Sequence, residues 1–157
     1  MTDPRAAIRK AKRIVVKIGS STLARDPQAH ARLARAIKEL HDEKKSVVLV
    51  SSGAIALGTR KLGYKGRPKE MAKLQAAASA GQSLLMRAYE EAFAVEGLSV
   101  AQVLLTHADL ADRTRANNAR AALGALMDAR CVPILNENDA VAVEEIKFGD
   151  NDELSAM

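Results

Sequence analysis

Four short aliphatic runs, each followed by a stretch with helical character, constrain this chain most strongly. The runs cover residues 13–18, 47–50, 98–105 and 131–135. Their β-branched and aliphatic content is typical of strands buried on both faces of a sheet. Strands that alternate with helices predict a parallel sheet with helices on both faces. We therefore expect an α/β fold of the three-layer α/β/α type.

The stretches between the runs predict the helices. Asp26 and Pro27 provide the N-cap and the first position of a helix that ends near residue 44, and a short helix is expected at 54–58. Longer helices are expected at 69–95 and 113–128, and a last one at 154–157. Residues 19–22 and 106–109 are expected to form turns, and 141–147 a hairpin arm. The small side chains at 76–81 favour tight packing on the sheet over a subunit contact.

Composition excludes several classes of protein. The chain has 157 residues, enough for one core, and 48% of them are hydrophobic. The net charge of +5 suits an anionic ligand, but aromatic residues make up only 3%, so base stacking on nucleic acid is not expected. Cys131 lies in an apolar run and is expected to be a buried thiol. Without a membrane span or a signal-peptide core, a cytoplasmic protein is expected.

Lys17 lies in the first aliphatic run, just before Gly19, Ser20 and Ser21. Burying a lysine is costly unless its ammonium group emerges at the end of the strand. Such an ammonium group, together with the backbone amides of Gly19, Ser20 and Ser21, would form a phosphate site. The spacing of a Walker A loop is absent. A lysine that merely reaches the surface remains the alternative.

The second run ends in Ser52, Gly53 and Ala54, a similar arrangement. Gly53 would let a ligand approach the backbone, and the amides of Gly53 and Ala54 would suit a carboxylate. An ordinary N-cap at Ser52 is the alternative. The three histidines lack the spacing of metal ligands, so no protein metal site is expected.

Two polar clusters stand near the end of the sequence, at residues 136–139 and 148–152. The first follows a buried run directly, and in open α/β sheets ligands bind at the carboxyl ends of strands. Two clusters of carboxamides and carboxylates within about twenty residues could converge on one small polar ligand. Asx-rich turns are the alternative for both clusters.

With these motifs and the segment 74–82 in view, the chain resembles the amino acid kinase family from about residue 13 to its end. The combination of Ser-Gly-Ala-Ile-Ala, Asn-Glu-Asn-Asp and Gly-Asp-Asn-Asp indicates a glutamate-phosphorylating member. The resemblance implies ATP- and Mg²⁺-dependent phosphorylation of the L-glutamate γ-carboxylate to L-glutamyl 5-phosphate, the first step of proline biosynthesis.

The resemblance also implies roles for individual residues. Lys17 and Asp152 match catalytic positions, where the aspartate orients lysine. Three positions match glutamate-binding residues: Ser52, Asp139 and Asn151.

The family domain is longer than this chain, so residues 1–157 are expected to be the N-terminal, substrate-binding part of one truncated domain, inactive without the nucleotide-binding half. The full-length protein is expected to be a homo-oligomer, with proline as a feedback inhibitor. Another family member that acts on a different acid or on carbamate stays open, as does a non-catalytic amino acid-binding module.

Overall fold

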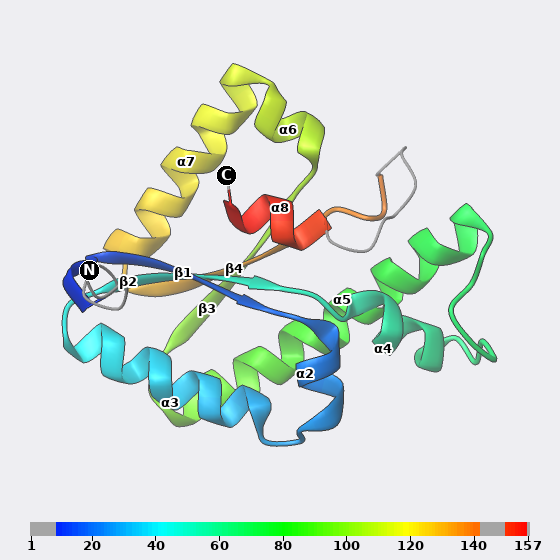
Figure 1. Cartoon of the computed structure of the whole chain (residues 1–157), viewed down its shortest axis with the longest axis horizontal. Coiled ribbons are helices and arrows are strands. Elements are labelled where there is room, and N and C mark those ends of the chain that lie inside the picture. Colours follow the sequence, from blue (N-terminus) through cyan, green and yellow to red (C-terminus); the bar gives the residue numbers. More distant parts are fainter. Residues whose placement is uncertain (1–8, 142–149, 157) are drawn as a thin grey trace, which may run out of the picture.

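The computed structural model describes residues 9–141 and 150–156, and it contains one four-stranded parallel sheet (Figure 1). The strands lie in the order β1-β2-β4-β3, and they are β1 (Arg13–Ile18), β2 (Ser46–Ser51), β3 (Ser99–Leu105) and β4 (Cys131–Glu137). The helices are α2 (Ser20–Arg25), α3 (Ala29–Asp42), α4 (Ala54–Lys61), α5 (Met71–Val95), α6 (His107–Ala111), α7 (Arg113–Asp128) and α8 (Asp150–Ala156).

The order of the strands explains why helices cover both faces. The chain proceeds from β1 through β2 to β3 in one direction, and α2, α3, α4 and α5 lie on one side of the sheet (Figure 1). It then turns back to place β4 between β2 and β3, and α6 and α7 lie on the other side. Because crossovers between parallel strands keep one hand, a reversal of direction moves the helices to the opposite face. The predicted α/β/α sandwich is confirmed.

The face that carries α3 and α5 holds the larger core. Side chains alternate along a strand, so Val47 and Leu49 of β2 point to this face while Val48 and Val50 point to the other. The buried residues that pack here include Ala34, Ile37, Leu85, Met86, Tyr89, Phe93, Val132 and Ile134. This core fixes the long helix α5 against β2 and β4.

The face that carries α6, α7 and α8 holds a smaller core. Its buried residues are Val50, Leu135 and Leu154, and Leu154 belongs to α8. Helix α7, all of which is described, has no fully buried residue. In the described part of the chain, no helix is both long and apolar enough to cross a membrane.

Helices α4 and α5 touch backbone to backbone. A Cβ added to Gly81 would overlap the carbonyl oxygen of Ala54, and one added to Gly58 would overlap the carbonyl oxygen of Ala77. The small residues of α5 thus serve close packing within the chain, but the predicted partner is wrong: these glycines pack against helix α4 and not against the sheet.

Some predicted boundaries are wrong. Residues 20–25 form a helix and not a turn, and α3 begins at Ala29, because Asp26 ends α2 and its carboxylate accepts the Gln28 amide in a turn. The predicted turn at 106–109 is instead the capping box of α6, in which Thr106 and Asp109 bond reciprocally. Helix α8 begins at Asp150, four residues before the predicted start. Residues 142–149, which include most of the predicted hairpin arm and Phe148–Gly149 of the second polar cluster, lie outside the described residues.

Candidate functional site

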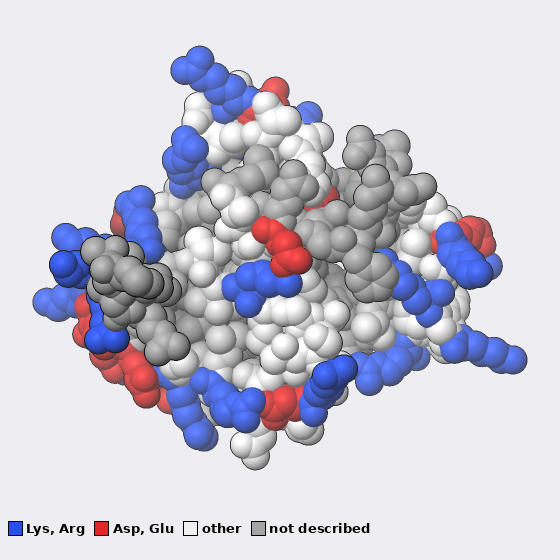
Figure 2. Space-filling view, viewed as in Figure 1, with Lys and Arg blue, Asp and Glu red and all other residues white. Residues whose placement is uncertain are grey.

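The carboxyl ends of β1, β2 and β4 meet at one edge of the sheet, where helix α8 also lies (Figure 1). The side chain of Lys17, near the end of β1, forms an ion pair with Asp152 of α8, and about a third of the lysine side chain is exposed. In Figure 2 the middle of this face is largely uncharged, apart from a small group of both signs over α8 and β1. The lysine therefore emerges at the strand end, as predicted, and it has a carboxylate partner.

The turns after β1 and β2 lie next to each other. A Cβ on Gly53 would lie 3.8 Å from Cβ of Ser20, and a Cβ on Gly19 would lie 3.8 Å from Lys17 Nζ. Gly53 has a φ of 118°, which other residues rarely adopt, and it caps α4, whose first residue is the buried Ala54. Gly19 caps α2, so the amides of Ser20 and Ser21 precede the first helical bonds, which Thr22 and Leu23 donate to Gly19.

Asn151 of α8 is the centre of a hydrogen-bond cluster. Its Nδ2 donates to the Ser51 carbonyl oxygen over 3.1 Å, to Ser52 Oγ over 2.8 Å and to Asn136 Oδ1 over 2.9 Å. The cluster brings together residues about one hundred positions apart in the sequence. It joins α8 to the ends of β2 and β4, so the two predicted polar clusters do converge.

Asn136 connects this cluster to helix α5. The residue is buried, with 3% of its surface exposed, and its Nδ2 donates to Gln82 Oε1 over 2.9 Å. Gln82 Nε2 in turn donates to Gln102 Oε1 of β3 over 2.9 Å. Four carboxamides from α8, β4, α5 and β3 are therefore linked in one row.

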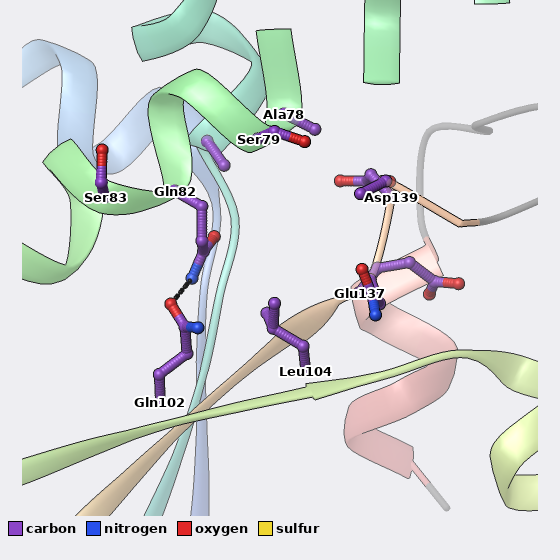
Figure 3. A pocket seen from close by; sticks show the side chains of 11 residues that line it. Ala78, Ser79, Gln82, Ser83, Gln102, Leu104, Glu137 and Asp139 are labelled. Atoms are coloured by element: carbon purple, nitrogen blue, oxygen red, sulfur yellow. Dashed lines mark hydrogen bonds between the residues drawn. The ribbon is translucent and has the colours of Figure 1, made fainter. Parts of the chain in front are cut away.

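Beside this row lies a pocket of about 320 Å³. Figure 3 shows it between α5, β3 and the segment that follows β4, with Gln82 and Gln102 on one side and Glu137 and Asp139 on the other. The lining residues are Ala54, Ala78, Ser79, Gln82, Ser83, Gln102, Leu104, Glu137, Asn138, Asp139 and Ala140. Its walls are apolar and amide-rich, with carboxylates at one end, which suits a small zwitterionic ligand.

The structure divides the predicted site residues into two groups. Lys17, Ser52, Asn151 and Asp152 lie together at the strand ends. Asp139 and Ala54 instead line the pocket, and Asp139 is buried to 9% exposure. Asn136 and Gln82 link the two groups by hydrogen bonds.

A second, fully buried contact supports β2 on the side of the sheet that carries α5. The hydroxyl of Tyr89, fully buried on α5, lies 2.7 Å from Ser51 Oγ, and burial raises the pKa of Tyr89 to about 12. Tyr89 therefore stays neutral and holds the residue whose carbonyl group accepts from Asn151.

Sequence reasoning missed Gln82, Gln102 and Tyr89 as parts of this region. Asn136 carried a signal, because a carboxamide that continues a buried aliphatic run must find partners. Gln102 carried none, since it lies in a stretch that reads as ordinary strand, and Gln82 entered only as the last residue of the segment 74–82 that carries the family resemblance. Among residues 9–141 and 150–156, no group of three or more His, Cys, Asp or Glu side chains could hold a metal ion.

Comparison with known proteins agrees with the family resemblance found in the sequence. The model of the amino acid kinase family matches residues 12–157. A glutamate 5-kinase of Thermus thermophilus is 57% identical over 150 residues, which cover 93% of this chain and 40% of the relative. Glutamate 5-kinases of Geobacter metallireducens and Azoarcus sp. are 54% and 52% identical and cover 97% and 98% of the chain. The chain spans about two fifths of the length of the curated relatives it matches.

Proposed function

The chain belongs to the amino acid kinase family, and we propose that it is the N-terminal, substrate-binding part of an enzyme that phosphorylates the γ-carboxylate of L-glutamate. The product would be L-glutamyl 5-phosphate, the first intermediate of proline biosynthesis. The observation that carries the proposal is the cluster at the strand ends, where the Lys17–Asp152 pair adjoins the bonds of Asn151 to Ser52 and Asn136. Relatives that are 52–57% identical and bear the name glutamate 5-kinase support it.

The proposed reaction needs no covalent intermediate with the protein. A glutamate carboxylate is already a nucleophile at neutral pH, so no general base is needed. Phosphoryl transfer depends on positioning and on stabilising the charge of the transferring group. Lys17 would supply a positive charge there, and Asp152 would hold the lysine in place through their ion pair.

The substrate amino acid would be held by the pocket and the adjoining cluster. Asp139 provides a buried carboxylate for the ammonium group of the substrate. Ser52, with Gly53 and Ala54 behind it, would face a carboxylate group. Asn151 would contribute mainly by holding Ser52, because the two hydrogens of its Nδ2 are already shared among three acceptor oxygen atoms.

ATP would supply the phosphoryl group, bound largely by parts of the full-length protein beyond this chain. The described residues do not fit a dedicated Mg²⁺ site, since they offer no cluster of three or more metal-ligating side chains. The ion would accompany the ATP phosphates. Homo-oligomerisation, inhibition by proline and a cytoplasmic location remain part of the proposal.

A substrate panel tests this function. Purified full-length protein is incubated with ATP, Mg²⁺ and one of four acceptors: L-glutamate, L-aspartate, N-acetyl-L-glutamate or carbamate. Acyl phosphate is trapped with hydroxylamine while ADP is measured in parallel. We expect hydroxamate and ADP in equal amounts with L-glutamate and far less with the others. ADP release that is independent of the acceptor, or a preference for another acid, would contradict the proposal.

A further inference from the structure

The four carboxamides of Asn151, Asn136, Gln82 and Gln102 form a row whose hydrogen bonds all run in one direction. Asn151 donates to Asn136, Asn136 donates to Gln82, and Gln82 donates to Gln102. A carboxamide can be turned by 180°, so such a row could in principle run either way. Its direction therefore requires a cause.

Two backbone groups at the Asn151 end fix the direction. The Ser51 carbonyl oxygen can only accept, so the group of Asn151 that faces it must be the NH₂ group. The Glu137 backbone N–H can only donate, and it bonds to Asn136 Oδ1 over 3.0 Å. Asn136 Oδ1 therefore accepts from both Asn151 Nδ2 and the Glu137 N–H. The NH₂ group of Asn136 must then face Gln82, and Gln82 must offer its oxygen.

This orientation determines what Ser52 can offer a ligand. Ser52 Oγ accepts from Asn151 Nδ2 over 2.8 Å. A hydroxyl oxygen that accepts one hydrogen bond still has its own proton to donate. The carboxamide row therefore prepares the Ser52 hydroxyl as a donor, which is the role that recognition of a carboxylate requires.

We propose that Gln82 is a positioning residue for the substrate: its Oε1 holds the Asn136 carboxamide, which together with the backbone groups of Ser51 and Glu137 keeps Asn151 in the orientation that makes the Ser52 hydroxyl a hydrogen-bond donor to a substrate carboxylate. The proposal rests on the proposed function. Gln82 acts through other residues because its Oε1 bonds to Asn136 and its Nε2 bonds to Gln102. Ser79 and Ser83 on the same helix bond instead to carbonyl groups of that helix.

The test compares Gln82→Met, which keeps the length of the side chain but cannot bond to Asn136, with Gln82→Glu, which keeps an acceptor for it. Loss of one hydrogen bond typically changes affinity by about 3- to 10-fold. We expect Gln82→Met in the full-length protein to raise the KM for glutamate by that factor. The KM for ATP and kcat should stay within about twofold. Gln82→Glu should restore the glutamate KM most of the way, because Gln102 can turn its amide to donate to the new carboxylate.

The matched control is Gln28→Met, the same substitution at an exposed glutamine before α3 that makes no side-chain cap bond. It should leave all three constants unchanged. The proposal is overturned if Gln82→Glu is as impaired as Gln82→Met, or if Gln82→Met lowers kcat and raises both KM values together. Either result would mean that Gln82 only stabilises the fold.

A second readout separates this proposal from the proposed function. Urea unfolding is measured for Gln82→Met, for Asn151→Ala and for the double variant. If the row couples the two residues, the double variant should lose less of the unfolding midpoint than the two single losses added together. Additive losses would overturn the row even in an active glutamate kinase. Coupling in a protein that does not phosphorylate glutamate would refute the function but retain the row.

Discussion

On the α3–α5 side of the sheet the helices bury Leu85, Tyr89 and Phe93 almost completely. On the other side α7 has no fully buried residue, and Leu154 is the one buried residue among the described side chains of α8. The difference extends to glycine. Gly81 on the first side leaves no room for a Cβ, and Gly124 of α7 has no described neighbour within 4 Å of that position. One side is thus a rigid support, and the other carries α8 with Asn151 and Asp152 on few buried contacts.

Adding one methyl group to each side should have opposite effects. Gly81→Ala would force its Cβ into the backbone of α4, 2.7 Å from the Ala54 carbonyl carbon, and neither backbone can yield cheaply. Overpacking costs about 1–3 kcal/mol, and contact with backbone should place this variant at or above about 3 kcal/mol. Gly124→Ala should stabilise the protein by about 0.5–1 kcal/mol, because alanine favours the helix.

Urea unfolding of the two variants measures both effects. Equal destabilisation by Gly81→Ala and Gly124→Ala would show that the two sides do not differ in packing. A stable Gly81→Ala protein would show that α4 and α5 can separate without loss.

Leucine truncation should separate stability from substrate binding. Leu85→Ala removes a side chain with 1% exposure, and such changes cost about 2–5 kcal/mol. Leu154→Ala, in the smaller core, should cost less stability but should raise the glutamate KM more, because α8 carries Asn151 and Asp152. Unfolding curves and steady-state kinetics on the same preparations provide both values. A larger KM effect from Leu85→Ala would contradict this assignment of roles.

The smallest expected effect is a pH dependence of the unfolding free energy that comes from histidines on the α3–α5 side of the sheet. Burial lowers the pKa of both His30 and His41 of α3 below 6.5, and Arg130 lowers that of His41 further. The unfolded chain therefore takes up protons at these sites before the folded chain does, and stability falls as pH drops below about 6.5. His41→Gln should flatten the unfolding free energy between pH 6.5 and 5. An unchanged slope in that variant would show that His41 does not contribute.

The sequence predicts strands and long helices well where local pattern and burial agree. Residues 13–18 and 113–128 match β1 and α7 to the residue. The errors arise where tertiary contacts override local signals. Asp26 and Pro27 have the features of a helix start, yet they form the turn between α2 and α3. Strand β4 continues through Asn136 and Glu137, because β3 pairs with it as far as Leu105.

For the site, the sequence predicts which residues gather at the strand ends but not how they are connected. Lys17, Ser52 and Asn151 follow from their positions near strand ends and in polar clusters. The row through Gln82 and Gln102 depends on how α5 lies over the sheet and on the pairing of Leu104 with Asn136. Neither of these is encoded in a local pattern, so no motif search along the chain would find the row.

The most direct test of the account is the kinetics of Lys17→Ala in the full-length protein. If Lys17 stabilises the transferring phosphoryl group, kcat should fall by about 10²–10³-fold, while the KM for glutamate changes by only a few fold. Asp152→Asn, which removes the charge of its partner, should cause a smaller loss of kcat. A Lys17→Ala protein with nearly normal kcat would contradict the account. It would mean that Lys17 is a surface lysine with no role in catalysis.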